Sequence, residues 1–524
     1  MPTFPALRGD RYTDVLIIGG GLCGLLTAYR LQQEGVNSLM LIEADELCGG
    51  TSAHTTAKIT AQHGLIYAKL LKTLGAERAA GYAEANLRAI SQYAALAERF
   101  SFGFRPCDAV AYAAAPKRLS ALEEELRATE RLGLPVRYAP PSSLTELPFR
   151  AAGGLRFPRQ ACMQPLALAA ALTDALAAGG ASIYTHTPAL AHGGGRVFTP
   201  NGRIAARVII LATQFPFMDK SGFYYARLWQ QRSYLVALPN TPPLKNIYWG
   251  ADEGAAVTTL RGYDGGVILG GGAHKVGHET DRAHYARLLR AARRLYPQAW
   301  TGREIDGAPQ SGRLPTADPT DAVSASLPTY PHQSKCANYA PQAWAAQDCL
   351  THDGVPVIGR YAALDDALGG RVYLASGFGK WGMTGSMIAA DIFAAALAGR
   401  AHPQAALFSP SRAALSAKAK SFSVQNLDMV GSYVGGLLRP VTRTAASLKR
   451  GEGAIVQLGG HRRGAYRDEN GRLHVIKPYC GHMGCPLRFN AEEKTWDCPC
   501  HGSRYDVDGH VLHDPAPAAG KRSR

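Results

Sequence analysis

Apolar residues in this 524-residue chain gather in short continuous runs. Four of these runs read as strands, and helical patterns follow the first and the last of them. Residues from about 67 to 150 also read as helices, whereas residues from about 227 to 277 read as strands. The pattern predicts an α/β Rossmann-like domain with an α+β region between its segments. The four runs are 14–18, 39–43, 209–213 and 372–376.

A glycine-rich turn joins the first strand to its helix. Gly19, Gly21 and Gly24 have GxGxxG spacing, and Glu43 closes the second strand. The spacing alone is a weak signal, but strand, glycine turn, helix, strand and terminal acid in one unit is a strong one. The glycines let the backbone approach a pyrophosphate at the helix N-terminus, and Glu43 is placed to accept from a ribose hydroxyl. We therefore predict a bound dinucleotide.

A second glycine-rich turn follows the last strand and leads into a helix. Its backbone donors suit the electron-rich edge of a reduced flavin, so the turn favours FAD over NAD. The stretch 270–277 is also glycine-rich, but its last glycine comes too late and no apolar helix follows. Electrons are therefore expected to enter from an organic substrate and not from a nicotinamide. The predicted flavin contacts here are Gly377, Gly379, Lys380, Trp381, Gly382, Met383 and Thr384.

Cysteine and histidine pairs near the end of the chain fit a Rieske 2Fe-2S cluster. Such a cluster has two thiolates on one iron and two imidazoles on the other, so a Cys-x-His loop must face a Cys-x-x-His loop. Cys480 and His482 supply the first pair, and Cys498 and His501 the second. A zinc site is the alternative, and the prolines and glycines between the ligands and two spare cysteines count against it.

The cluster loops resemble those of the Rieske proteins of quinol-oxidising respiratory complexes. The resemblance implies that Ser503 and Tyr505 hydrogen-bond the cluster sulfurs and raise the reduction potential. It also implies that Cys485 and Cys500 bridge the two loops as a disulfide. The loop 514–517 departs from the family pattern, so the usual closing strand is in doubt.

The rest of the chain resembles the glycine oxidase, sarcosine oxidase and D-amino-acid oxidase family of flavoproteins, in particular members with a C-terminal Rieske domain. The matching stretches are 51–64, 346–349 and 353–359, whereas Gln214 replaces a usual glycine. The resemblance implies FAD contacts from Gly50, Thr51, His54 and Thr55. In related dehydrogenases a similar histidine joins the flavin covalently, so covalent attachment through His54 is a hypothesis, with an ordinary hydrogen-bonding role as the alternative.

Length and resemblance together predict two or three domains, because 524 residues exceed one compact core. A flavoprotein at 1–412 precedes a linker at 413–450 and an all-β Rieske domain at 451–524. Residues 302–339 look like an insertion, either a surface loop or a lid. Within the flavoprotein we expect FAD-binding segments at about 10–66, 150–215 and 345–405, and an α+β substrate domain at about 67–149 and 220–300.

Candidate substrate contacts are cations. Arg261, and less firmly Arg232 with Tyr234, suit a substrate carboxylate, because guanidinium groups bind carboxylates bidentately. Lys58 and Lys380 are expected near the flavin ring, where positive charge stabilises the reduced anion. A metal at His274 and His278 with Glu279 is not favoured, because Gly277 intervenes and no further ligand matches.

Composition narrows the partners. The net charge of +16 favours an acidic carrier protein or an anionic membrane face over nucleic acid, for which no motif exists. The segment 428–440 could lie on a membrane, but a linker helix that packs on its own protein is favoured. Cysteines outside the cluster loops lack framework spacing, and no signal core or membrane-spanning run occurs, so we predict a cytoplasmic protein.

These predictions combine into a dehydrogenase. An amine or amino-acid-like substrate would reduce FAD by hydride transfer, and single electrons would pass through the cluster to an acidic carrier protein or a quinone. Two alternatives stay open. Electrons could flow inward from a carrier to the cluster, FAD and substrate, or the protein could be a redox-responsive module without an organic substrate.

Overall fold

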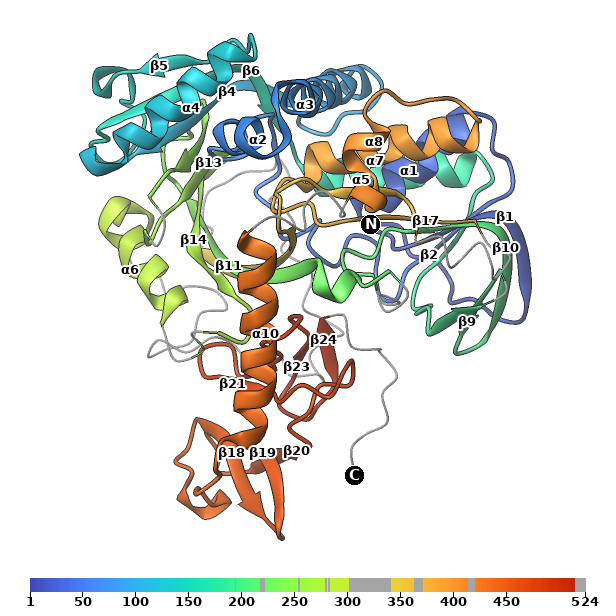
Figure 1. The fold of residues 1–524 in the computed structure, drawn as a ribbon, viewed down its shortest axis with the longest axis vertical. Coiled ribbons are helices and arrows are strands. Elements are labelled where there is room, and N and C mark those ends of the chain that lie inside the picture. Colours follow the sequence, from blue (N-terminus) through green and yellow to red (C-terminus); the bar gives the residue numbers. More distant parts are fainter. Residues whose placement is uncertain are drawn as a thin grey trace.

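The computed structural model describes residues 1–193, 195–216, 222–252, 255–278, 280, 283–300, 341–361, 371–412 and 420–513. The predicted insertion at 302–339, Glu279 and the loop 514–517 lie outside these residues. The described chain forms three parts, which lie at the right, the upper left and the bottom of Figure 1.

A mixed sheet forms the first part. Its central strand β1 (Arg11–Ile18) pairs in parallel with β2 (Leu39–Ile42) and β10 (Gly202–Leu211). Val15 and Ile17 enter the core on one face, and the residues after each of them enter the core on the other face. Burial on both faces explains the continuous apolar runs. The other described strands of this sheet are β7 (Ser182–Tyr184), β8 (Ala191–Gly193), β9 (Arg196–Thr199), β16 (Val357–Arg360) and β17 (Arg371–Ser376).

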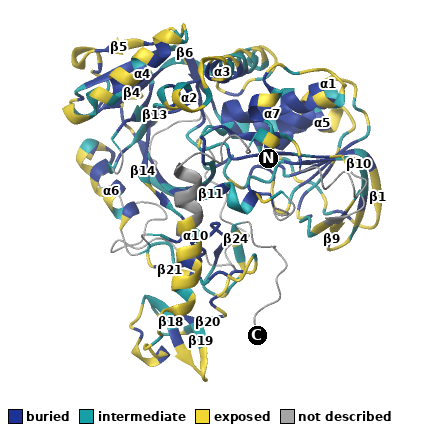
Figure 2. Cartoon of the chain, viewed as in Figure 1, coloured by how far each residue is buried: buried dark blue, intermediate teal, exposed yellow. Residues whose placement is uncertain are grey.

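Helices cover one face of this sheet. The helix α1 (Leu22–Gln33) contacts both α5 (Pro165–Ala178) and α7 (Gly382–Leu397), and α3 (Ala76–Ala97) packs on α7. Figure 2 shows α7 buried along most of its length, and α8 (Ala405–Phe408) contacts α3. The predicted α/β Rossmann-like fold is confirmed.

A second, larger sheet forms the part at the upper left. Two of its strands, β4 (Arg105–Ala113) and β5 (Arg137–Ala139), lie in the region expected to be helical, so that expectation was wrong in part. Alanines and polar residues in β4 hide the alternation typical of a strand. The other described strands are β3 (Lys58–Ile59), β6 (Gly153–Cys162), β11 (Leu228–Pro239), β12 (Ile247–Gly250), β13 (Thr259–Tyr263), β14 (Gly266–Lys275) and β15 (Gln342–Thr351).

Three of these strands come from segments outside the expected substrate domain. The strands β3, β6 and β15 fall in the segments assigned to FAD binding, yet they pair within the second sheet. The chain therefore passes back and forth between the two sheets several times, and residues of both sheets meet at the boundary between them. The helices α2 (Tyr67–Leu74), α4 (Leu119–Arg131) and α6 (His284–Leu295) accompany the second sheet.

The third part is all-β, as predicted. One described sheet contains β18 (Glu452–Leu458), β19 (His461–Arg467) and β20 (Leu473–Ile476). The other contains β21 (Arg488–Asn490), β22 (Thr495–Asp497), β23 (Arg504–Tyr505) and β24 (Val511–His513). Trp496 is fully buried and its cluster includes Cys480, Cys485, Cys498 and Cys500.

The helix α10 (Lys420–Leu438) runs beside the third part in Figure 1. Ser432 is buried, and a Cβ on Gly436 would lie 3.0 Å from Pro486, so this face packs on the protein itself. Leu427, Val430 and Val434 are exposed. A bilayer-spanning helix needs a longer apolar stretch than any helix in the described ranges offers.

A buried carboxylate joins the third part to the second sheet. Glu493 Oε2 accepts from Arg232 Nη2 at 2.5 Å and from Arg504 Nη2 at 2.7 Å, and the Tyr234 hydroxyl donates to Oε1 at 3.0 Å. The side chains of Arg232 and Glu493 are only 10% and 9% exposed. The expectation that Arg232 and Tyr234 bind a substrate carboxylate is therefore corrected, because they hold a carboxylate of the protein.

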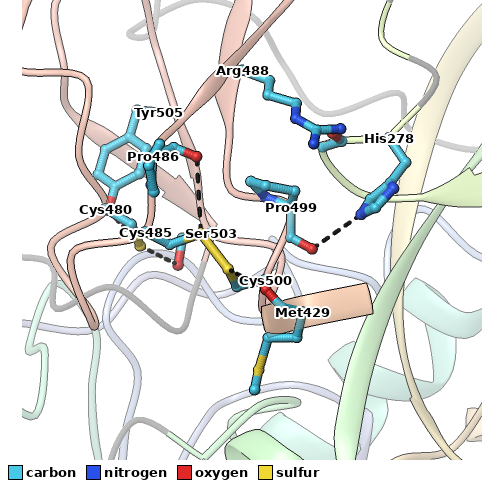
Figure 3. The surroundings of a disulfide bond; sticks show 11 residues. His278, Met429, Cys480, Cys485, Pro486, Arg488, Pro499, Cys500, Ser503 and Tyr505 are labelled. Carbon is cyan, nitrogen blue, oxygen red and sulfur yellow. Dashed lines mark hydrogen bonds between the residues drawn. A yellow bond between two sulfur atoms is a disulfide. The ribbon is translucent and has the colours of Figure 1, made fainter. Parts of the chain in front are cut away.

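Backbone contacts complete this interface. His278 Nε2 lies 3.2 Å from the carbonyl oxygen of Pro499, as Figure 3 shows, and Arg488 donates to the Gly277 carbonyl at 3.2 Å. His274 instead stacks on His284 with ring centroids 4.2 Å apart. His274 and His278 thus serve packing and docking.

The substitution Glu493→Gln should weaken the docking of the third part. It leaves Arg232 buried without its counter-charge, and breaking a buried pair costs about 3–5 kcal/mol. We expect a lower unfolding midpoint in urea, followed by fluorescence and by the visible absorbance of the cluster. Glu84→Gln, which changes an exposed carboxylate 3.8 Å from Arg88, should leave the midpoint unchanged.

Lowering the pH should weaken the same interaction, because it protonates Glu493. Burial opposes ionisation of Glu493, but Arg232 and Arg504 outweigh it and hold its pKa well below the usual range. The stabilisation is fully present above the unfolded carboxyl pKa of about 4.3 and is lost progressively as the pH falls from there through the depressed folded value. An equal effect of Glu84→Gln, or wild-type stability of Glu493→Gln at pH 7, would contradict this account.

Candidate active site and metal centre

The first glycine turn tolerates no side chain at two positions. Gly19 has φ +112°, and a Cβ on Gly24 would lie 1.9 Å from the carbonyl oxygen of Gly19. Gly21 is the N-cap residue of α1 and, being glycine, provides no side-chain cap for the helix. The Glu43 carboxylate accepts from the Gly20 N–H at 2.6 Å, and burial raises the pKa of Glu43. The close backbone fits a dinucleotide phosphate, while the ribose contact of Glu43 stays a prediction.

The second glycine turn has an unusual backbone. Gly377, Gly379 and Lys380 all have positive φ, at +71°, +57° and +74°. A Cβ on Gly377 would lie 2.5 Å from Thr351 Cγ2, so glycine is required there. Trp381 caps α7, whose first turn contains Gly382 and the buried Met383 and Thr384. A non-glycine residue held at positive φ is characteristic of functional sites.

A cavity of about 100 Å³ lies where these segments meet the second sheet. The sequence predicted part of its lining, namely Thr51, His54, Thr55, Lys58, Lys380 and Trp381. It also named Tyr234 of β11, which lines the cavity, but it missed Ser233, Trp249, Thr259 and Asp348, which β11, β12, β13 and β15 contribute. Ser233 and Asp348 lie beside other polar residues of their strands, such as Arg232 and Gln347, so no distinctive signal marked them in the sequence. Gly50 is exposed and does not line this cavity.

Lys58 is buried in the wall of the cavity. Its Nζ donates to the Tyr248 carbonyl and to Thr259 Oγ1. Burial, with Arg261 nearby, lowers the pKa of Lys58 to about 7. A neutral amine has two N–H groups, so these two acceptors leave its lone pair available to a substrate. Lys58 is thus closer to a proton acceptor than to the permanent cation expected from the sequence.

Arg261 lies behind the cavity. It is 3% exposed, and its guanidinium donates to the carbonyls of Thr56 and Gly262. Arg261 is not among the described residues that line the cavity, so its expected contact with a substrate carboxylate receives no support. Lys380 does line the cavity, where Nζ donates to Ser233 Oγ at 2.9 Å, and burial raises the pKa of the neighbouring Asp348.

His54 also lines the cavity and is half-buried. Its Nδ1 lies 2.8 Å from the Gly50 carbonyl oxygen, and burial lowers the pKa of the ring. The histidine is therefore held neutral and oriented by its own loop. Covalent attachment to the flavin stays a prediction.

The two cysteine and histidine loops face each other. The rings of His482 and His501 are 4.9 Å apart at an interplanar angle of 85°. The Cys498 thiol, Ser503 and Tyr505 hydrogen-bond Cys480, which lowers the pKa of that thiol. The structure joins Cys485 and Cys500 by a disulfide (Figure 3). The four predicted ligands thus stand together.

The donor set can be tested against a 2Fe-2S cluster. His501 is 3% exposed, and both of its ring nitrogens are buried without a hydrogen-bond partner among the described residues. Such orphaned nitrogens suit metal ligation. Cys485, Cys498 and Cys500 also have sulfurs within 4.8 Å of one another. The disulfide consumes two of these sulfurs, so two cysteines and two histidines remain, as a Rieske centre requires.

The hydroxyls predicted to contact the cluster sulfurs are in reach. Ser503 Oγ lies 3.4 Å and the Tyr505 hydroxyl 3.3 Å from Cys480 Sγ, and Figure 3 shows Ser503 and Tyr505 on either side of it. The Gly481 N–H donates to the Tyr505 oxygen at 2.7 Å, which orients the phenol.

Comparisons with known proteins agree with this arrangement. The family model for FAD dependent oxidoreductases (DAO) matches residues 14–328, and that for the Rieske [2Fe-2S] domain matches residues 440–522. The chain is 32% identical to the putative Rieske 2Fe-2S iron-sulfur protein YhfW of Bacillus subtilis, over 98% of this chain and 94% of that protein. It is also 50% identical over 42 residues to the cytochrome b6-f complex iron-sulfur subunit of Synechococcus elongatus, which is 8% of this chain and 24% of the subunit.

Solved structures share the flavoprotein fold. Glycine oxidase from Geobacillus kaustophilus aligns with a TM-score of 0.57 at 17% identity, over 77% of this chain and 99% of the oxidase. L-proline dehydrogenase from P. horikoshii aligns with a TM-score of 0.55 at 15% identity, over 78% and 99% of the two chains. The cofactors are accordingly FAD and a Rieske cluster. The chain belongs to the FAD dependent oxidoreductase (DAO) family, and in it a Rieske [2Fe-2S] domain follows the flavoprotein.

Proposed function

We propose that this oxidoreductase is a dehydrogenase for an amine or amino-acid-like substrate, which delivers electrons through its Rieske cluster to an external acceptor. One observation carries the proposal: the cluster loop with His501 and Gly502 packs on β11 and β15, the strands whose residues line the cavity. An enzyme that passed its electrons directly to oxygen would need no such neighbour. The structural likeness to glycine oxidase and L-proline dehydrogenase supports the substrate class.

The residues of the cavity suit amine oxidation. FAD accepts two electrons as a hydride from a carbon next to nitrogen, and the cluster passes electrons singly. A substrate ammonium must first lose a proton, and Lys58 Nζ is placed to take it when Lys58 is neutral. Lys380 adds positive charge beside Asp348 and Ser233. Trp249 and Trp381 supply apolar walls that exclude water.

The external acceptor is proposed from charge. The net charge of +16 favours association with an acidic one-electron carrier protein, and a quinone at an anionic membrane is the other acceptor to test. The described cysteines outside the cluster loops are free, which suits the proposed cytoplasmic location.

An anaerobic titration tests the function. Amino acids and secondary or tertiary amines are added singly while flavin absorbance and the paramagnetic signal of the reduced cluster are recorded. We expect one compound to bleach the flavin first and then to raise the cluster signal. If no compound does so, but a reduced carrier fills the cluster and then the flavin, electrons flow inward and the dehydrogenase is ruled out.

The rate of flavin reduction should depend on the proton of Lys58. Because only neutral Lys58 accepts a proton, the rate should rise as the pH passes upward through about 7. Lys58→Met should abolish this limb and lower the rate about 10²–10⁴-fold, which is typical of a lost general base. Stopped-flow measurements of flavin reduction between about pH 5.5 and 9 record both effects, because this range extends to either side of the Lys58 pKa of about 7.

Lys69→Met is the control, because Lys69 is an exposed lysine that donates to the His352 carbonyl outside the cavity. It should retain the wild-type pH profile. A rising limb that persists in Lys58→Met would assign the base to another residue.

The cluster potential should depend on Tyr505 and Ser503. Hydrogen bonds to a ligand sulfur stabilise the reduced, more negative cluster, so Tyr505→Phe and Ser503→Ala should each lower the potential. One bond of about 1 kcal/mol corresponds to about 40 mV for a one-electron couple. A redox titration followed by electron paramagnetic resonance measures the shift. Tyr479→Phe, which changes an exposed tyrosine next to Cys480, should not move the potential, and equal potentials in all three variants would exclude the effect.

A further inference from the structure

The wall between the cavity and the cluster domain is a single sheet layer. In β15, Ala346 and Asp348 line the cavity, whereas Gln347 between them faces the other way, because successive side chains of a strand alternate. In the adjacent β11, Ser233 lines the cavity and Gln230 faces the cluster domain. One layer of backbone therefore separates the two redox sites.

Two buried glutamines cross from this layer to the cluster loop. Gln347 Nε2 donates to the Gly502 carbonyl at 2.8 Å and to Gln230 Oε1 at 2.5 Å. Gln230 Nε2 donates to the His501 carbonyl at 2.9 Å. Gln347 is 2% and Gln230 3% exposed, so water does not compete for these bonds.

The same residue also contacts the cofactor loop. The Gln347 carbonyl accepts from Thr51 Oγ1 at 2.9 Å, and Thr51 lines the cavity. On the cluster side, Gly502 has φ +87°, and a Cβ there would lie 2.7 Å from Gln230 Cβ. A glycine thus permits the close approach of the cluster loop to the sheet. Gln347 is bonded to the flavin side through its backbone and to the cluster side through its side chain.

We propose that Gln347, positioned by Gln230, is the bridge through which electrons pass between flavin and cluster. Hydrogen bonds and covalent bonds continue from Thr51 through Gln347 to Gly502 and His501, one of the proposed iron ligands. The assignment rests on the proposed exchange of electrons between FAD and the cluster but not on its direction.

The electron count fixes what the bridge carries. One substrate molecule delivers a hydride, which is two electrons and one proton, and its nitrogen releases a second proton. Two electrons then cross the bridge in succession. Each reduces one ferric ion of the cluster to ferrous and leaves to an external one-electron carrier, while the protons pass to solvent.

Gln347→Met tests the bridge, because methionine has a similar volume but no N–H donor. The flavin of the complete protein is reduced by a light flash in the presence of a sacrificial electron donor such as EDTA, and the arrival of the electron at the cluster is followed by absorbance. We expect the transfer rate to fall at least tenfold. Gln342→Met, at a half-buried glutamine on the same strand that pairs with Ala237, should transfer at the wild-type rate.

Further measurements separate a bridge from a merely structural residue. The dithionite-reduced cluster should keep its paramagnetic spectrum and potential in Gln347→Met, and hydrogen exchange of the loop 498–503 should show it still docked. If Gln347→Met proves unstable, Gln347→Asn keeps the amide but is too short to reach Gly502, and it should slow transfer in the same way. Wild-type transfer in either folded variant overturns the proposal.

The test is independent of the substrate. A sacrificial donor, and not a substrate, supplies the electrons under the flash, so failure to find an oxidisable amine would count against the dehydrogenase but leave this result intact. Reduction of the cluster by a carrier, followed by electron arrival at the flavin, should be slowed by the same variants. A rate that is slowed in neither direction means that electrons take another route.

Discussion

The position of the cluster depends on one buried carboxylate. Glu493 comes from the Rieske domain, but two of its three partners, Arg232 and Tyr234, belong to β11 of the flavoprotein. Taking these charges out of water is costly, and only a complete set of partners repays it. Glu493, Arg232 and Arg504 must therefore lie at hydrogen-bonding distance and also point toward one another. Such a contact holds two domains in one register more strictly than an apolar surface of similar size would.

This fixed register matters because the side chains of β11 and β15 alternate between the two faces of the sheet. In β15, Ala346 and Asp348 face the cavity and Gln347 faces the cluster domain, and in β11 Ser233 faces the cavity and Gln230 the cluster loop, so one sheet serves two sites at once. A shift of one residue would exchange the two sets and destroy both. The bulge between Arg232 and Tyr234 in the pairing with β14 lies at this place. The sheet is thus a wall whose two faces carry different chemistry.

Local chemistry was predictable from the sequence, and chemistry assembled over long distances was not. The glycines at 19, 21 and 24 and the cysteine and histidine loops are short motifs whose spacing states their geometry. Glu493 and Gln347 act through residues more than 150 positions away, and no local pattern marks them. Arg232 and Arg261 had the residue type expected of a carboxylate site, but burial gave them other partners. The strand β4 was read as helix because alanine and polar residues obscured its period.

The two histidines of the cluster loops differ in burial, so one side of the domain faces the flavoprotein and the other faces away from it. His501 is 3% exposed and packs edge-on against Tyr225 of the flavoprotein, with ring centroids 5.9 Å apart. His482 is only half-buried, and the neighbouring Met483 is 41% exposed. Electron transfer slows steeply with distance, so a cluster between two partners serves best with one ligand toward each. The docking that buries His501 against the flavoprotein leaves His482 half-buried on the side that the proposed electron carrier would meet.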